Sequence, residues 1–166
     1  MIIRHIFLLL VFTVYSIHFA MGQSEILNIT KTADFEIDGK GSHNAWQRAN
    51  WVQLMMRGDG PAQDTQVKVM YSDTGIYFLF KCDDEVLTAT LTEDFADLYN
   101  EDVVEVFLWT EEEYPFYFEY ELSPLNYELP IMVPNRDGDF FGWLPWHYEG
   151  KRRTRHATSV RGGEKE

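Results

Sequence analysis

Two neighbouring strands are predicted between Tyr99 and Leu122, where apolar residues alternate with acidic ones. Successive side chains of a strand point to opposite faces of a sheet, so Glu105 falls into an otherwise apolar row. Its neighbours in that row are Val103, Phe107 and Trp109. The connection EEEYP, at residues 111–115, suits a longer hairpin loop that ends in a proline. We therefore expect a hairpin with one carboxylate placed among apolar side chains.

The second of these strands adds two more acidic residues to the pattern. Glu119 and Glu121 alternate with Phe118 and Tyr120. An antiparallel sheet commonly leaves one face in water, and alternating Glu is typical of such a face. Glu105 fits this explanation less well, because a carboxylate among apolar neighbours needs a hydrogen-bonding partner, a cation or a ligand. The face that gathers these three glutamates among aromatic rings is our first candidate for a binding site.

A second hairpin is predicted at residues 65–85, TQVKVMYSDTGIYFLFKCDDE, with its turn at residues 72–75. Its second strand is apolar on both faces, which predicts a central strand covered on both sides and a buried Cys82. Residues 26–49 predict an edge strand and then a short helix or turn, with Trp46 closing the end of a core. These elements together predict an all-β fold, a two-sheet antiparallel β-sandwich.

Residues 123–150 differ from the strands before them. Four prolines and an Asp-Gly-Asp turn signal predict a long irregular loop. The loop nevertheless carries many aromatic residues, Trp143 and Trp146 among them, and so much aromatic area argues against disorder. The rings either stack on a sugar or form a lid that only closes the core.

The charge of the chain restricts its partners. The formal net charge is −13, which argues against nucleic acid and anionic membrane surfaces as partners. The basic cluster KRRTRH at residues 151–156 is the exception, and we expect it to pair with the domain's own carboxylates; a local anion contact is the alternative. Cys82 is the only cysteine, so no intramolecular disulfide stabilises the fold.

Residues 1–22 are predicted to be a signal peptide, cleaved before Gln23. A membrane anchor is the competing interpretation, but the apolar run is short for a span and is interrupted by Ser16 and His18. We therefore expect a secreted or periplasmic protein with no stable membrane insertion after cleavage. Residues 23–166 then form a single domain.

An acid-rich segment, DDEVLTATLTEDFADLYNED, separates the two predicted hairpins at residues 83–102. Calcium takes several oxygen ligands, and Asp84 and Asp94 are our candidate ligands for a structural calcium ion. The spacing does not match the EF-hand loop. Acidic side chains that simply face water remain the alternative.

Four segments carry a family resemblance. They are FEIDGKGSHNAWQRA, TQVKVMYSDTGIYFLFKCDDEVL, LYNEDVVEVFLW and FYFEYELSPLN. In this order they resemble the family 9 carbohydrate-binding modules and their DOMON-like β-sandwich relatives, over roughly residues 34–160. The resemblance implies a jelly-roll or DOMON-like sandwich that binds sugars without catalysis. It also implies an association with enzymes that degrade plant polysaccharides.

The resemblance also implies roles for particular residues. The aromatic residue before the ED-V-V-E-V-F segment, Tyr99, corresponds to one wall of an aromatic clamp, and Glu105 to a ligand of the sugar. Glu121 stands where sugar-binding members place an Arg. The family continues into further strands that supply a second clamp Trp and amide ligands, whereas this sequence ends in RGGEKE. We therefore expect a C-terminally truncated chain or a shortened relative, with an exposed sheet edge prone to association.

Three functions remain open at this point. The first is a non-catalytic carbohydrate-binding module for a plant-type polysaccharide, using Tyr99, Glu105 and Glu121, with Trp143 and Trp146 as further rings. The second is a glycoside hydrolase with paired Glu residues. The third is a haem-binding DOMON-like domain, for which Met70 with His147 is the pairing to test. We expect a binding module rather than an enzyme, because no further catalytic motif accompanies the carboxylates.

Overall fold

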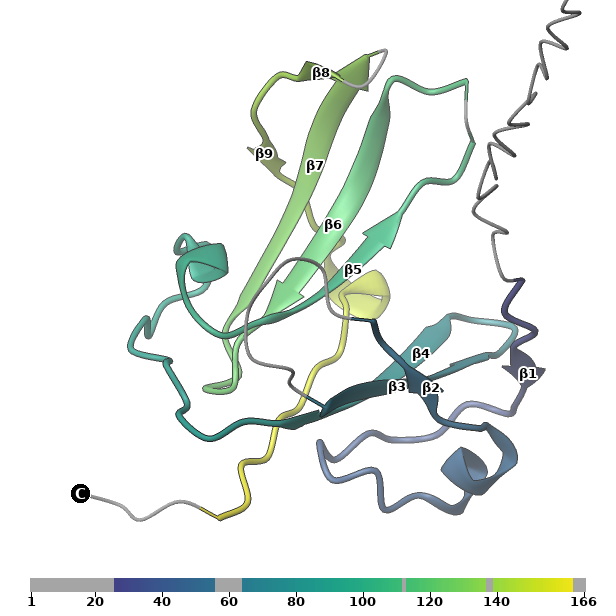
Figure 1. Cartoon of the computed structure of the whole chain (residues 1–166). Helices are drawn as coiled ribbons and strands as arrows, with labels where there is room; N and C mark the ends of the chain where they lie inside the picture. The colour runs from purple at the N-terminus through teal and green to yellow at the C-terminus, as the bar shows by residue number, and fades with distance from the viewer. Residues whose placement is uncertain (1–25, 56–63, 112, 137–138, 163–166) are drawn as a thin grey trace, which may run out of the picture.

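The computed structural model describes residues 26–55, 64–111, 113–136 and 139–162, and their regular structure is nearly all β (Figure 1). The first sheet contains β1 (Thr30–Lys31), β2 (Val52–Gln53), β3 (Asp64–Tyr71) and β4 (Ile76–Asp83). The second contains β5 (Val104–Leu108), β6 (Phe116–Leu122), β7 (Glu128–Arg136), β8 (Asp139–Phe140) and β9 (Leu144–Pro145). Three 3₁₀ turns are η1 (Asn44–Arg48), η2 (Leu98–Asn100) and η3 (Gly150–Arg152).

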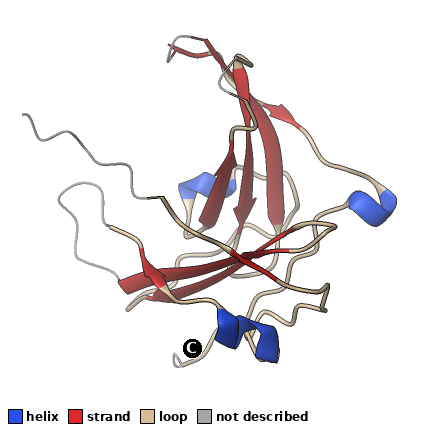
Figure 2. Cartoon of the chain, turned by 90° about the vertical axis from the view of Figure 1, so that its right-hand side faces the viewer, coloured by secondary structure: helices blue, strands red, loops and turns tan. Residues whose placement is uncertain are grey.

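The two sheets form a sandwich-like arrangement, which confirms the predicted all-β class. Figure 2 shows the strands of the second sheet standing steeply on those of the first. All strand pairs are antiparallel except β1 with β3, which run parallel. The predicted signal peptide, residues 1–22, lies outside the described residues. Within the described part of the chain, no helix has the length and apolar character to cross a membrane.

The first sheet is centred on β3, which pairs with β1, β2 and β4. The β3–β4 hairpin is confirmed, with Val67 opposite Phe80. The prediction of a central β4 is wrong, because the pairings described for this strand are with β3 alone. Its second apolar face is instead covered by a loop, since Tyr77 and Leu79 pack against a cluster that contains Trp46. Cys82 is exposed near the end of β4, so its predicted burial is also wrong.

Trp46 has the structural role predicted for it. It projects from η1, is only 4% exposed, and packs on the buried Met70 of β3. Phe35 stacks between His43 and Tyr77, with ring centroids 4.4 Å and 4.5 Å apart. These aromatic contacts fasten the N-terminal segment to the outer face of the first sheet.

The second sheet corrects the prediction of an irregular loop after Leu122. β7 is a nine-residue strand that pairs with β6 along its length. Pro130 and Pro134 obscured this strand, because proline is normally absent from central strands. Their carbonyls accept hydrogen bonds from Trp146 and Phe141, so both prolines point toward the side of the short strands β8 and β9. Because the proline nitrogens face β8 and β9, their lack of an N–H group removes no hydrogen bond between β7 and β6.

One face of the second sheet is covered only in part. Leu98 of η2 packs with Leu129, Ile131 and Val133 of β7 in a buried cluster. Phe107 of β5, on the same face, is 57% exposed. The half of this face next to η2 is therefore covered, and the half formed by β5 and β6, which carries the exposed Phe107, is its accessible half, although Glu121 within it is buried.

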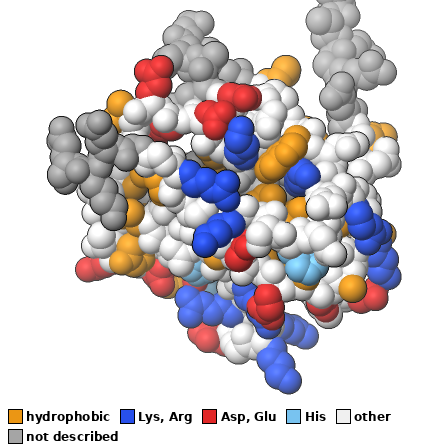
Figure 3. All heavy atoms as spheres, turned by 90° about the horizontal axis from the view of Figure 1, so that it is seen from below, with side chains coloured by type: hydrophobic (Ala, Val, Ile, Leu, Met, Phe, Trp, Pro, Cys, Tyr) orange, Lys and Arg blue, Asp and Glu red, His pale blue; other side chains and the backbone are white. Residues whose placement is uncertain are grey.

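Basic side chains spread over the side of the molecule that Figure 3 shows from below. Among the described residues, exposed ion pairs join Lys31 with Asp73 at 2.5 Å, Lys81 with Asp83 at 3.3 Å and Arg155 with Glu36 at 3.1 Å. The last pair confirms the expectation that the basic cluster at residues 151–156 neutralises the domain's own carboxylates. Such exposed pairs contribute little stability individually.

Candidate functional site

Three glutamates meet on the accessible half of the second sheet. Glu105 on β5 lies directly opposite Glu121 on β6, and Glu119 lies two residues away on the same face of β6. One carboxylate oxygen of each lies within 4.8 Å of the others. The alternation that the sequence predicted thus brings all three together. We call Glu105, Glu119 and Glu121 the carboxylate cluster.

The electrostatics of the carboxylate cluster are dominated by Glu121. Its side chain is 1% exposed, and its Oε2 atom has no hydrogen-bond partner among the described residues. Burial, together with the charges of Glu119 and Glu105, raises its pKa to about 8, although the backbone N–H of Tyr99 opposes the shift. Burial also raises the pKa of Glu105 and Glu119, and the charge of Glu105 adds to the effect on Glu119. The sequence pattern suggested a solvent-exposed face, but these carboxyl groups are partly buried.

Two aromatic residues border the carboxylate cluster. Tyr99, in η2, is 46% exposed, and its backbone N–H donates to Glu121. Partial burial and a hydrogen bond with Asp97 raise the pKa of the Tyr99 phenol, while a hydrogen bond from Trp143 lowers it. Trp143 comes from the segment between β8 and β9, far along the chain. We call Tyr99 and Trp143 the aromatic pair.

Trp146 does not join the aromatic pair. Its ring contacts Phe118 at 6.1 Å and Tyr148 at 6.2 Å. Phe118 points to the face of β6 opposite that of Glu119, because adjacent side chains alternate. The two tryptophans that the sequence suggested together therefore serve different faces of the sheet.

The loop acids suggested as calcium ligands have other partners. Asp84 accepts a hydrogen bond from the backbone N–H of Val86 at 3.1 Å. Asp94 accepts one from the backbone N–H of Glu128 at 3.1 Å and lies 3.8 Å from Arg153. Neither belongs to a group of three acidic or metal-binding side chains within the described residues. These contacts fold the acid-rich segment against the second sheet.

Sequence reasoning missed a second buried carboxylate, Glu128, which is 2% exposed. It accepts hydrogen bonds from the Tyr120 hydroxyl and from Arg153, both at 2.6 Å, and lies 3.6 Å from His156. Its strand was hidden by the flanking prolines. The available signal was the basic cluster at residues 151–156, which was expected to pair with carboxylates of the domain and which supplies Arg153 to Glu128.

The suggested haem ligands lie in different environments. Met70 is fully buried beneath Trp46 in the first sheet. The ring of His147 lies 5.4 Å from that of Phe95 and close to Glu149, at 3.5 Å. Met70 therefore fills the core, as a methionine in a strand commonly does.

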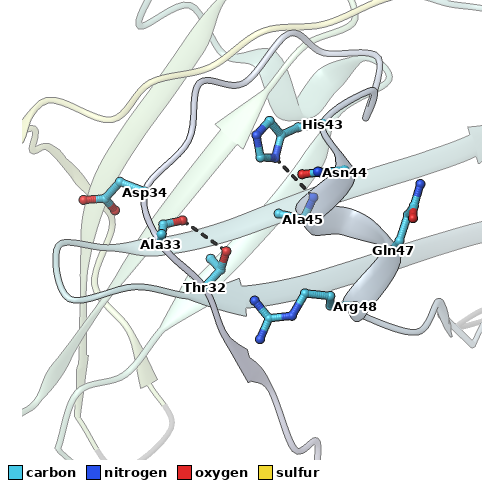
Figure 4. Close-up of a pocket in the computed structure, with 8 residues that line it drawn as sticks. All are labelled: Thr32, Ala33, Asp34, His43, Asn44, Ala45, Gln47 and Arg48. Carbon is cyan, nitrogen blue, oxygen red and sulfur yellow. Dashed lines mark hydrogen bonds between the residues drawn. The ribbon is translucent and has the colours of Figure 1, made fainter.

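A surface hollow of about 340 Å³ lies beside η1, away from the carboxylate cluster (Figure 4). Its polar groups are engaged within the protein. Asp34 accepts hydrogen bonds from Thr74 and Tyr77, His43 accepts one from the backbone N–H of Ala45, and Arg48 donates one to the carbonyl of Lys31. These bonds hold the N-terminal segment, so we assign the hollow a structural origin.

Comparison with known proteins identifies the family of the chain. The family model of the carbohydrate family 9 binding domain-like proteins matches residues 37–129, more than half of the sequence. The match includes Tyr99, Glu105 and Glu121, and it ends before Trp143. Searches of curated proteins and of solved structures found no match. The chain therefore belongs to the carbohydrate family 9 binding domain-like family.

Proposed function

We propose that this chain binds a carbohydrate, without catalysis, on the accessible half of the second sheet. The observation that supports this most directly is the convergence of Tyr99, Glu105, Glu121 and Trp143, which four separate segments contribute. A sugar needs this combination, because its apolar ring faces stack on aromatic rings while its hydroxyls donate hydrogen bonds to carboxylates. Family membership supports the same ligand class.

The arrangement suggests separate tasks for the two parts of the site. Tyr99 is exposed enough to offer a ring face to a sugar, and Trp143 is half-buried beside it. Glu105 is half-buried in an otherwise apolar row and has no cationic partner among the described residues, so a sugar hydroxyl can satisfy its carboxylate. Stacking then supplies most of the contact area, and the carboxylates orient the ring.

Binding is better supported than hydrolysis. A retaining glycosidase needs two carboxyl groups roughly 5–5.5 Å apart that flank the scissile bond. Here all three carboxylates gather on one side of a sheet, and Glu121 is almost fully buried. We therefore propose an accessory module, secreted or periplasmic, that serves the breakdown of a plant-type polysaccharide.

Affinity electrophoresis on plant polysaccharides, followed by a glycan array, tests this function. We expect Tyr99→Ala and Glu105→Gln to weaken binding at least about tenfold, since each removes a principal contact. Tyr114→Ala is the matched aromatic control, because Tyr114 is also 46% exposed but stacks on Phe116 instead. Glu111→Gln is the matched acidic control in the exposed β5–β6 connection.

Unchanged binding in both Tyr99→Ala and Glu105→Gln would move the site away from this face. Turnover of aryl glycosides that is lost in Glu105→Gln would replace the binding function with hydrolysis. We expect no such turnover.

A further inference from the structure

Three carboxyl groups lie together on the second sheet without a cationic partner among the described residues. The raised pKa of Glu121, about 8, means that this carboxyl keeps its proton at neutral pH unless a cation displaces it. Within the described part of the chain, no Lys, Arg or His forms an ion pair with Glu105, Glu119 or Glu121. Like charges at this spacing repel, and partial burial strengthens the repulsion because less water screens it. The cluster therefore favours a positively charged occupant.

The second observation concerns a single atom, Oε2 of Glu121. This atom is buried and has no hydrogen-bond partner among the described residues, whereas the carboxyl group as a whole interacts with the backbone N–H of Tyr99 and with the carboxyl of Glu119. A buried carboxylate oxygen without a partner is costly, and such groups in native proteins commonly mark an ion or water that completes the site. One carboxylate oxygen of Glu105 and one of Glu119 lie within 4.8 Å of a carboxylate oxygen of Glu121.

We propose that Glu105, Glu119 and Glu121 bind a hard divalent cation of the size of Ca²⁺ on this face. The site is distinct from the acidic loop residues Asp84 and Asp94. It shares Glu105 and Glu121 with the proposed sugar site, but cation binding there does not require a sugar.

The ligand atoms favour calcium over transition metals. All three side chains offer carboxylate oxygens, which suit hard cations, whereas zinc sites in proteins are dominated by Cys and His. Three carboxylates can supply up to six oxygens when each binds through both atoms, and calcium takes six to eight. The charge of the cluster also exceeds that of the cation, so binding removes most of the repulsion.

The spacing of the carboxylate oxygens is compatible with calcium. Calcium–oxygen distances of about 2.3–2.6 Å allow ligand atoms on opposite sides of the ion to be about 4.6–5.2 Å apart. The separation of the cluster oxygens, within 4.8 Å, falls inside this limit without rearrangement. Magnesium, at about 2.0–2.1 Å, requires a tighter and more regular shell. The antiparallel ladder between β5 and β6 holds Glu105 and Glu121 in this register.

Isothermal titration of calcium chloride into the full chain, after chelator treatment and without any sugar, tests the proposal. We expect one calcium ion per chain, bound at least about tenfold more tightly than magnesium. Calcium should also raise the melting temperature, because a ligand that binds only the folded state stabilises it.

Variants locate the site. We expect Glu121→Gln and Glu119→Gln each to weaken calcium binding at least about tenfold, because each removes a charged ligand. Glu119 is half-buried, so Glu119→Gln keeps the test valid if the Glu121 variant fails to fold. Glu111→Gln and Asp84→Asn, which remove the same charge outside the cluster, should bind calcium as the native chain does.

Terbium luminescence gives an independent measurement. Three aromatic residues lie near the cluster and can sensitise a lanthanide bound there: Tyr99, Tyr117 and Trp143. Glu121 acts electrostatically on Tyr99, and Glu119 and Glu105 act on Tyr117, while Trp143 is hydrogen-bonded to Tyr99. We expect a sensitised signal that calcium displaces and that Glu121→Gln abolishes.

Two results would overturn the proposal. One is the absence of calcium binding in a folded native chain. The other is calcium binding that Asp84→Asn or Asp94→Asn removes and that Glu119→Gln and Glu121→Gln leave intact. Neither result depends on whether polysaccharide is bound, so failure of this proposal is distinguishable from failure of the carbohydrate function.

Discussion

Two buried glutamates on neighbouring strands of the second sheet have opposite surroundings. Glu121 on β6 and Glu128 on β7 are 1% and 2% exposed. They lie one residue apart in the β6–β7 register and point to opposite faces. Glu128 is held by Arg153, Tyr120 and His156. Glu121 instead has other carboxyls beside it and an oxygen without a hydrogen-bond partner among the described residues.

The comparison shows that burial alone does not define the role of a carboxylate. Glu128 is paired and hydrogen-bonded, as a structural buried charge must be, and it ties the C-terminal segment to the sheet. Glu121 lacks this compensation within the described residues. The burial of Glu121 is therefore uncompensated by a cation within the described residues, which is the observation on which the proposed cation site rests.

Removing the partner of Glu128 has the largest expected effect on stability. Arg153→Met keeps the apolar part of the side chain but removes the guanidinium that pairs with the buried Glu128 carboxylate. Glu128 would then lack its closest cationic partner, as Glu121 does. We expect the free energy of unfolding to fall clearly, because the buried Glu128 carboxylate loses its guanidinium, although the half-exposed position of Arg153 and the nearby His156 limit the loss. Urea denaturation measures the change.

Arg152→Met is the control for this variant, since Arg152 is the adjacent cation and lies over the Tyr148 ring at 6.0 Å. Its expected effect is within about 0.5 kcal/mol, as for an ordinary surface substitution. If both variants were equally stable, Glu128 would not depend on Arg153.

The opposite result is expected at Glu121. In chelator, at pH about 8 or above, Glu121→Gln removes the repulsion by Glu105 and Glu119 and keeps an acceptor for the Tyr99 N–H. We expect the free energy of unfolding to rise by about 1 kcal/mol, because an uncompensated buried charge is replaced by a neutral group of the same shape. Glu111→Gln should leave it unchanged. Destabilisation by Glu121→Gln in chelator would show that Glu121 has a compensating partner after all.

A third class of acid, exposed but bonded to backbone, should show the smallest effect. Hydrogen bonds from the Thr90 hydroxyl and from the N–H groups of Leu91 and Thr90 lower the pKa of Glu101 below its ordinary value of 4.5. Such a group stabilises the fold above its unfolded pKa, and this contribution is lost as the pH falls through the folded value.

We therefore expect the melting temperature to fall more in the native chain than in Glu101→Gln between about pH 6 and pH 3. Thermal melts at several pH values measure this difference, and hydrogen exchange at the Thr90 and Leu91 amides locates it. Parallel curves for the two proteins would show that the Glu101 bonds do not contribute in solution.

Local patterns were sufficient where neighbours in sequence are neighbours in the sheet. The β3–β4 and β5–β6 hairpins follow from period-two alternation, and so does the shared face of Glu105, Glu119 and Glu121. The turn before Trp46 and the pairing of the basic C-terminal cluster with acids were also predictable from composition and spacing.

β7 was not predictable in the same way, because its prolines mimic a loop. They are tolerated only because they point toward the short strands β8 and β9, a fact that depends on strand order. The burial of Glu121 and Glu128 depends on the same strand, β7. Glu128 belongs to β7, and Glu121 lies on the neighbouring β6, so pairing of the two strands places both residues in the interior of the sheet.

The sequence by itself determined the strand class, the family and which acidic side chains share a face, since these follow from residues close together in the chain. The tertiary structure decided which carboxylates are paired and which are not. Trp143 reaches Tyr99 and Arg153 reaches Glu128 only when distant segments pack together. Charge compensation depends on such contacts, so no periodicity along the chain could distinguish the uncompensated Glu121 from the paired Glu128.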